Sequence, residues 1–166
     1  YLPQSGHITI GGTAAADLPD GVRRKTLGCV EQHFARVPGT VLDQITLADP
    51  AVSRDMAVEA ATLAGLDEVI RAFPQGYDTL LTESGINISQ GQKQLMTIAR
   101  AMLLKSQMLI LDEATSNVDT RTEIQIQSAM RKLMAGKTCF VIAHRLSTIQ
   151  NADNILVVKD GDIIEQ

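Results

Sequence analysis

Four apolar residues, 108–111, run directly into two adjacent carboxylates, Asp112 and Glu113. A short, unbroken apolar run is typical of a strand that is covered on both faces, as in a parallel sheet. Ligands of open α/β sheets gather at the carboxyl ends of the strands, which is where both carboxylates fall. Neighbouring side chains on a strand point in opposite directions, so one carboxylate can hold a metal ion while the other takes a proton from water. A strand that simply ends in polar residues is the alternative interpretation.

A second apolar run, residues 138–143, is followed by His144. Parallel strands end at the same edge of a sheet, so this run is predicted to bring His144 close to Asp112 and Glu113. A lone histidine is more often structural than catalytic. A histidine beside two carboxylates at a strand end is a candidate for catalysis, and both interpretations stay open here.

The segment between these two runs has the pattern of an amphipathic helix. Thr120 and Glu123, three residues apart, are predicted to form a capping box at its start. Gly136 is placed to end the helix, because glycine readily adopts the left-handed conformation that follows many helices. The apolar side of this helix is predicted to consist of Ile126, Ala129, Met130 and Leu133.

Another helix is predicted to begin at Ser89, which forms a capping box with Gln92. A helix start with a glycine in its first turn, here Gly91, presents free N–H groups and the positive end of the helix dipole, which suits a phosphate. A well-capped structural helix is the alternative. The buried stripe of this helix is predicted to consist of Leu95, Ile98, Ala99 and Met102.

The remaining segments complete the pattern of an α/β domain. Further strands are predicted over residues 7–10, 26–30 and 154–158. A mostly helical region is predicted over residues 41–72. Loops or breaks are predicted at residues 36–40, at Asp49 and Pro50, at Gly65 and at residues 74–77.

Composition limits the classes of protein that this chain can belong to. With 166 residues, of which 45% are hydrophobic, the chain can bury one core, and its net charge of -4 gives no reason to expect a nucleic-acid surface. Cys29 and Cys139 lack metal-type spacing and are predicted to be buried thiols in a reducing compartment. No apolar run approaches the ~20 residues of a membrane helix, and no signal peptide is recognised, so a soluble intracellular domain is predicted.

A phosphate-binding P-loop is absent from these 166 residues. Gly136, Lys137 and Thr138 resemble the end of such a loop, but the earlier glycine would fall at Arg131. The direction is also wrong, because a P-loop joins a strand to a following helix and this segment leaves a helix for a strand.

Five motifs, in this order, resemble those of the nucleotide-binding domain of an ABC transporter, over nearly the whole chain. The matching segments are Gln32 (Q-loop), residues 88–92 (signature), residues 108–112 (Walker B) with Glu113 (catalytic glutamate), residues 116–119 (D-loop) and His144 (switch histidine). Residues 39–41 and 82–85 look more like exporters than importers. Gln90 replaces the first glycine of the usual Leu-Ser-Gly-Gly-Gln signature, whereas Ser89 and Gly91 are kept.

The resemblance implies an α/β fold with the mostly parallel sheet of P-loop NTPases, flanked by helices. Residues 1–32 and 105–166 are expected to form the catalytic core, and residues 40–104 a helical subdomain that carries the signature helix. We expect the chain to be part of a longer polypeptide, in which the preceding segment holds the P-loop (Walker A) and the aromatic residue that stacks on adenine. Transmembrane domains are expected in the same polypeptide, with this domain at the cytoplasmic face of the cell membrane.

The resemblance also implies ATP hydrolysis with ATP and Mg²⁺ as cofactors. Glu113 would act as general base toward the attacking water, and Asp112 would act on Mg²⁺ through bound water. Gln32 would be a further Mg²⁺ ligand that senses the γ-phosphate, and His144 would hydrogen-bond that phosphate and help to fix the water.

The implied working unit is a head-to-tail dimer with a second nucleotide-binding domain. Ser89, Gly91 and Gln92 would face the nucleotide of the partner, and Asp119 would lie at the dimer contact. When the two domains of the dimer close, the movement would be passed to the membrane helices through residues 32–44, and a substrate would be moved outward.

Three alternative functions remain. An ATPase of the same superfamily that acts on DNA or ribosomes shares the core motifs, but the exporter-like segments and the acidic balance favour transport. A non-catalytic binding or assembly module would have kept the fold and lost activity, and a nucleotide-free structural domain is the third alternative.

Overall fold

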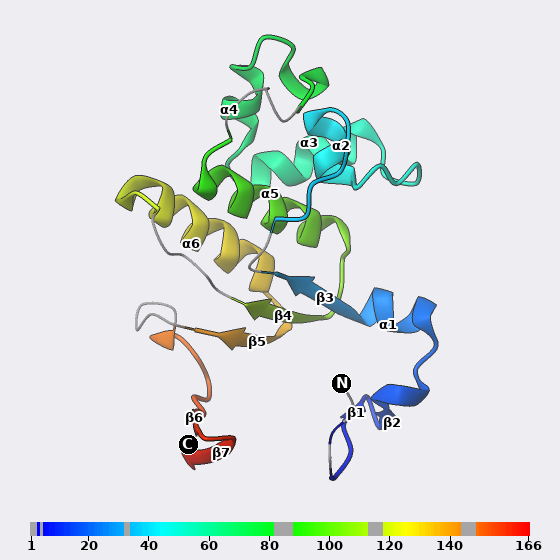
Figure 1. Ribbon diagram of the computed structural model, residues 1–166, viewed down its shortest axis with the longest axis vertical. Coiled ribbons are helices and arrows are strands. Elements are labelled where there is room, and N and C mark those ends of the chain that lie inside the picture. The colour runs from blue at the N-terminus through cyan, green and yellow to red at the C-terminus, as the bar shows by residue number, and fades with distance from the viewer. Residues whose placement is uncertain (1–2, 4, 32–33, 82–87, 113–117, 144–148) are drawn as a thin grey trace.

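Three parallel strands form the central sheet of the structure, a computed structural model in which residues 3, 5–31, 34–81, 88–112, 118–143 and 149–166 are described. The strands, in their spatial order, are β3 (Leu27–Val30), β4 (Met108–Asp112) and β5 (Thr138–Ile142). Leu27 lies level with Met108, and Met108 with Thr138, so all three strands start together (Figure 1). This confirms the predicted α/β class. The strand expected from Thr26 begins one residue later, because Thr26 ends a helix.

Two long helices cover one face of this sheet (Figure 1). They are α5 (Gln90–Leu103) and α6 (Thr120–Met134), and they pack against each other. Leu109 and Leu111 of β4 point into this layer and are fully buried. The predicted helical stripes are confirmed as part of the same core: Leu95, Ile98 and Ala99 of α5, and Ile126, Ala129 and Leu133 of α6, are buried, and Met102 and Met130 pack against them.

The other face of the sheet is open in the described part of the chain. Phe140 and Ile142 of β5 are 54% and 51% exposed, and Cys29 of β3 is also exposed. The prediction of a β4 strand covered on both faces is therefore wrong for the described residues, since its apolar run meets helices on one side only. The prediction that Cys29 is a buried thiol is wrong for the same reason.

A cluster of short helices stands above the far side of α5 (Figure 1). Its members are α2 (Val41–Thr46), α3 (Arg54–Leu63), α4 (Asp67–Arg71) and the 3₁₀ helix η2 (Gly76–Asp78). The predicted helical region with breaks is confirmed. Leu47 ends α2 with a left-handed conformation, and Gly65, with φ of +78°, separates α3 from α4.

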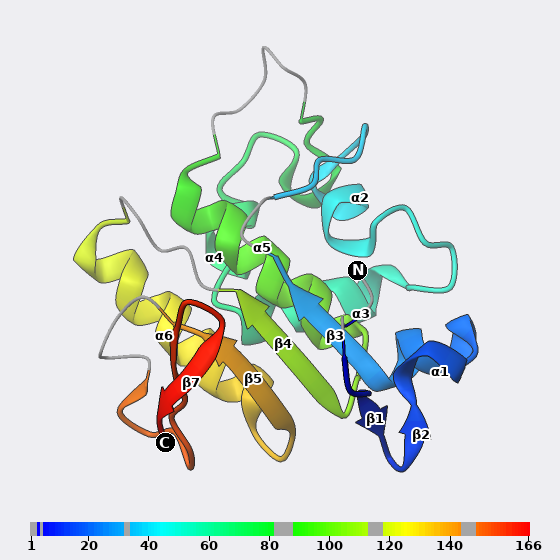
Figure 2. The same ribbon diagram turned by 60° about the horizontal axis from the view of Figure 1, so that its bottom comes forward.

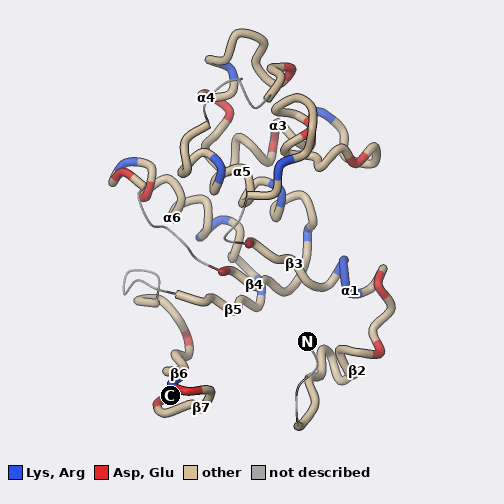
Figure 3. Tube along the Cα trace, in the orientation of Figure 1, with Lys and Arg blue, Asp and Glu red and all other residues tan. Residues whose placement is uncertain are grey.

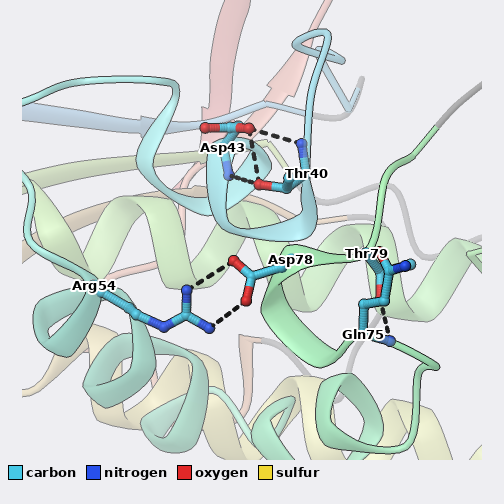
Figure 4. A network of polar contacts seen from close by, with 6 residues as sticks. All are labelled: Thr40, Asp43, Arg54, Gln75, Asp78 and Thr79. Carbon is cyan, nitrogen blue, oxygen red and sulfur yellow. Dashed lines mark hydrogen bonds and ion pairs between the residues drawn. The ribbon is translucent and has the colours of Figure 1, made fainter.

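Polar contacts hold this cluster together at its surface (Figure 4). Arg54 donates two hydrogen bonds of 2.8 Å to the carboxylate of Asp78, which joins α3 to η2. Thr40 and Asp43 form a capping box at the start of α2, and the backbone N–H of Gln75 donates to Thr79 Oγ1 over 3.2 Å. These pairs fix short helices that have little propensity to form alone.

The N-terminal and C-terminal segments each contain a small hairpin (Figure 2). The N-terminal segment contains β1 (Thr9–Ile10), β2 (Thr13–Ala14), the 3₁₀ helix η1 (Ala15–Asp17) and α1 (Asp20–Thr26). The C-terminal hairpin contains β6 (Val157–Lys159) and β7 (Asp162–Glu165), so the strand predicted over residues 154–158 begins later than expected. None of the helices in the described ranges is long and apolar enough to cross a membrane.

Candidate functional site

The carboxyl ends of β4 and β5 meet at one edge of the sheet, as the sequence predicted. Asp112, the last residue of β4, lies opposite Ile142, the last residue of β5. The Asp112 side chain is half-buried. Glu113 and His144 were predicted at the same edge, and Gln32 was expected as a further Mg²⁺ ligand, but all three lie outside the described residues. Their roles stay predictions.

A second carboxylate, Glu31, shares this edge with Asp112. The pKa of the Cys29 thiol is raised, first by partial burial and then by the negative charges of Glu31 and Asp112. In Figure 3 the tube is coloured as acidic at the carboxyl end of β3 and at that of β4. Hard carboxylate oxygens are ligands that Mg²⁺ accepts, so the residues present fit the expected metal. No group of three or more His, Cys, Asp and Glu side chains within the described ranges forms a metal cluster on its own.

The start of α5 is built as the sequence predicted. Ser89 Oγ accepts a hydrogen bond of 3.2 Å from the backbone N–H of Gln92, and Gln92 Oε1 accepts one of 3.0 Å from the backbone N–H of Ser89. The capping box is therefore confirmed. Gln90, the departure from the signature pattern, is exposed, whereas Gly91 is buried.

The start of α6 differs from the prediction. Asp119 is the N-cap, and its Oδ1 accepts a hydrogen bond of 3.0 Å from the backbone N–H of Thr122. The predicted capping box of Thr120 and Glu123 is wrong, because Thr120 is already the first helical residue. The bonds from Thr122 hold the pKa of the Asp119 carboxyl below its usual range.

The two helix starts lie side by side on the side toward which the arrowheads of β4 and β5 point (Figure 1). A methyl group placed on Gly91 would overlap Thr122 Cγ2 and lie 3.2 Å from Val118 Cγ1. The turn that contains Ser89, Gly91 and Gln92 therefore lies next to the helix start that Asp119 caps. Two adjacent helix N-termini with their N–H groups and dipoles are compatible with a phosphate ligand.

Arg100 is a structural cation that sequence reasoning missed. It is 9% exposed, and its guanidinium donates to the backbone oxygens of Gln44 (2.6 Å) and Ala35 (2.9 Å) and lies 4.4 Å from the centre of the Phe34 ring. Burial lowers the pKa of Arg100 to about 10, which leaves it charged at neutral pH. Arg100 thus ties α5 to the segment after Gln32. The signal was an arginine on the apolar side of a helix, where a charge needs several partners.

Comparison with known proteins identifies the family. A family model described as ABC transporter matches residues 1–116. The chain therefore belongs to the ABC transporter family, and the predicted resemblance to its nucleotide-binding domain is confirmed.

Three relatives show the kind of protein in which this domain occurs. An uncharacterized ABC transporter ATP-binding protein, YfiC of Bacillus subtilis, is 47% identical over 166 residues, which is all of this chain and 28% of that protein. A fatty acid ABC transporter ATP-binding/permease protein of Mycobacterium bovis is 48% identical over all of this chain and 26% of its own length. The alpha-hemolysin translocation ATP-binding protein HlyB of Escherichia coli O157:H7 is 42% identical over 99% of this chain and 23% of its own length. The chain thus spans about a quarter of the length of each of these three relatives.

Proposed function

We propose that this chain is part of the ATP-hydrolysing domain of an ABC exporter, in which hydrolysis in a head-to-tail dimer drives a substrate outward across a membrane. The main observation behind this proposal is that two strand ends and two helix starts lie on one side of the fold. Asp112 is at the strand edge, and Gly91 and Asp119 are at the helix starts. Family membership and relatives named for translocation support transport over the other activities of this fold.

The proposed chemistry divides the work at the strand edge. Mg²⁺ would supply positive charge that offsets the charge on the phosphates. Asp112 would hold the metal through bound water, with Gln32 as a further ligand. Glu113 would take the proton of the attacking water, an effect typically worth ~10²–10⁴ in rate, and His144 would hydrogen-bond the γ-phosphate.

The helix starts would serve the nucleotide of the partner domain. Ser89 and Gln92 order the first turn of α5 through their reciprocal hydrogen bonds, and the positive end of the helix dipole at this turn would favour the phosphates. Asp119, as the cap of α6, would lie at the dimer contact. Transmembrane domains in the same polypeptide would place this domain at the cytoplasmic face of the membrane, which the name ATP-binding/permease protein of one relative supports.

The test compares the 166-residue chain with the full polypeptide to which we propose that it belongs. The chain lacks a P-loop in its sequence, and with it most contacts to the β- and γ-phosphates, so we expect no meaningful ATP turnover from the chain alone. The full polypeptide in lipid vesicles should hydrolyse ATP in a Mg²⁺-dependent manner. Turnover by the full polypeptide that requires DNA or ribosomes would instead indicate an ATPase outside transport, and absent turnover would indicate a non-catalytic module.

A further inference from the structure

Gly91 lies close to the start of α6. It is buried, and a side-chain methyl at this position would point at α6, where it would overlap Thr122 Cγ2 and lie 3.3 Å from Thr122 Cβ and 3.2 Å from Val118 Cγ1. Space for a methyl group is therefore absent on the α6 side. An added methyl group would therefore force Thr122 to move, whatever binds at the helix starts.

Thr122 also holds the cap of its own helix. Its backbone N–H donates to Asp119 Oδ1 over 3.0 Å, and its side chain hydrogen-bonds the same carboxylate. One residue thus contacts Gly91 of α5 with its methyl group and Asp119 with its polar atoms.

Both partners of this contact belong to ordered helix starts. On α5, the reciprocal bonds of Ser89 and Gln92 fix the turn that contains Gly91. Further along the two helices, buried apolar residues continue the interface, among them Leu95 of α5 and Ile126 of α6. A shift at Gly91 therefore moves a whole helix start rather than a single side chain.

We propose that Thr122 is a positioning residue, whose contact with Gly91 sets the spacing between residues 89–92 and Asp119. The two segments then meet the nucleotide and the partner domain as one unit. This role rests on the proposed function, because it assumes that both segments act at the dimer contact. The contact itself does not depend on that function.

The test adds a methyl group to α5 and removes one from α6 in the full polypeptide. Gly91→Ala adds a methyl that collides with Thr122, and Thr122→Ser removes the Cγ2 methyl that it meets while keeping the hydroxyl and the N–H that serve Asp119. Gly21→Ala is the matched control, because Gly21 lies inside helix α1 with nothing within 4 Å of an added methyl group.

Gly91→Ala should lower the melting temperature and reduce ATP turnover by about tenfold or more, since a misplacement of 1 Å can cost up to ~10²-fold in rate. ATP binding to the P-loop of the same domain should stay unchanged, so the loss should fall on kcat. The double variant Gly91→Ala, Thr122→Ser should regain most of both losses, and Gly21→Ala should show neither.

Two results would overturn the proposal: a harmless Gly91→Ala, or a loss of turnover that Thr122→Ser does not relieve. The second result would mean that Gly91 serves a ligand directly. A rescue seen in melting temperature but not in turnover would keep the contact and refute the positioning role. A wild-type polypeptide without turnover would refute the proposed function and the positioning role together. The melting temperatures of the variants would still test the contact between Gly91 and Thr122.

Discussion

Asp112 and Glu113 are neighbours in the sequence, and the proposed mechanism gives them different tasks. Asp112 ends β4 as a half-buried residue at the sheet edge, a position that suits a group held near a metal ion. Glu113 follows it in the sequence and is assigned the proton transfer. Substitutions that keep the shape of each side chain can separate the two roles.

In the full polypeptide, Glu113→Gln should keep ATP binding and dimer closure while turnover falls by the ~10²–10⁴ expected of a lost general base. Asp112→Asn should weaken the Mg²⁺ site, so that nucleotide affinity and closure decline together with the rate. Equilibrium ATP binding and gel filtration measure both effects. Loss of ATP binding in Glu113→Gln, with binding retained in Asp112→Asn, would reverse the assignment.

Asp119 gives a second prediction at this scale, because its carboxylate caps α6. Its pKa is lowered in the folded state, so its contribution to stability is present at neutral pH and is lost as the pH falls below about 4. Asp119→Ala should therefore lower the melting temperature of the full polypeptide at pH 7, and this difference should shrink in acid. Asp119→Asn is the control, since asparagine is also a good N-cap. An equal penalty for Ala and Asn would mean that the charge, rather than the cap, matters.

At the scale of elements, α5 links two parts of the chain through Arg100. Gln44 and Arg100 both form hydrogen bonds with the backbone of the segment after Gln32. Val37 exchanges two with the side-chain amide of Gln44, and the carbonyl oxygen of Ala35 accepts one from Arg100. The helix that begins at Ser89 is thus tied to residues 34–37. Because closure is proposed to pass through residues 32–44, this connection lies on its path.

Arg100→Lys should destabilise the full polypeptide by about 2–4 kcal/mol, because the compact ammonium cannot satisfy all the carbonyl oxygens that the guanidinium bridges. Denaturant unfolding measures the loss. Arg121→Lys, at an exposed position of α6, is the matched control and should change stability by less than about 0.5 kcal/mol. Equal effects of the two substitutions would show that the bridge contributes nothing specific.

At the scale of the whole molecule, the sheet is covered unevenly. Helices cover one face (Figure 2), while Phe140 and Ile142 are exposed on the other. Exposed apolar patches of this kind favour association or limit stability. The 166-residue chain studied alone is therefore expected to self-associate or to be marginally stable.

Sedimentation of the 166-residue chain should show self-association that grows with concentration. Phe140→Ser combined with Ile142→Ser should reduce it, because both side chains are largely exposed and lose little packing. Phe73→Ser, at a half-buried position in the helical cluster, is a control that should not reduce association. A wild-type chain that is monomeric and unfolds sharply at high temperature would contradict the prediction.

Features set within a few residues could be predicted from the sequence. The Ser89–Gln92 capping box, the helical periods of α5 and α6 and the strands that end at Asp112 and Ile142 depend on local hydrogen bonds and on apolar spacing. The cap of α6 was predicted one residue too late. Asp119 rather than Thr120 is the cap, because its carboxylate accepts a hydrogen bond from the N–H of Thr122.

The tertiary structure alone decided the contacts between residues far apart in the chain. Arg100 meets Ala35 across 65 residues, and Gly91 meets Thr122 on another helix. Such contacts depend on where whole elements pack, and no local pattern specifies that position. The open face of the sheet was decided in the same way, because an apolar strand residue such as Phe140 is buried only where another element reaches it.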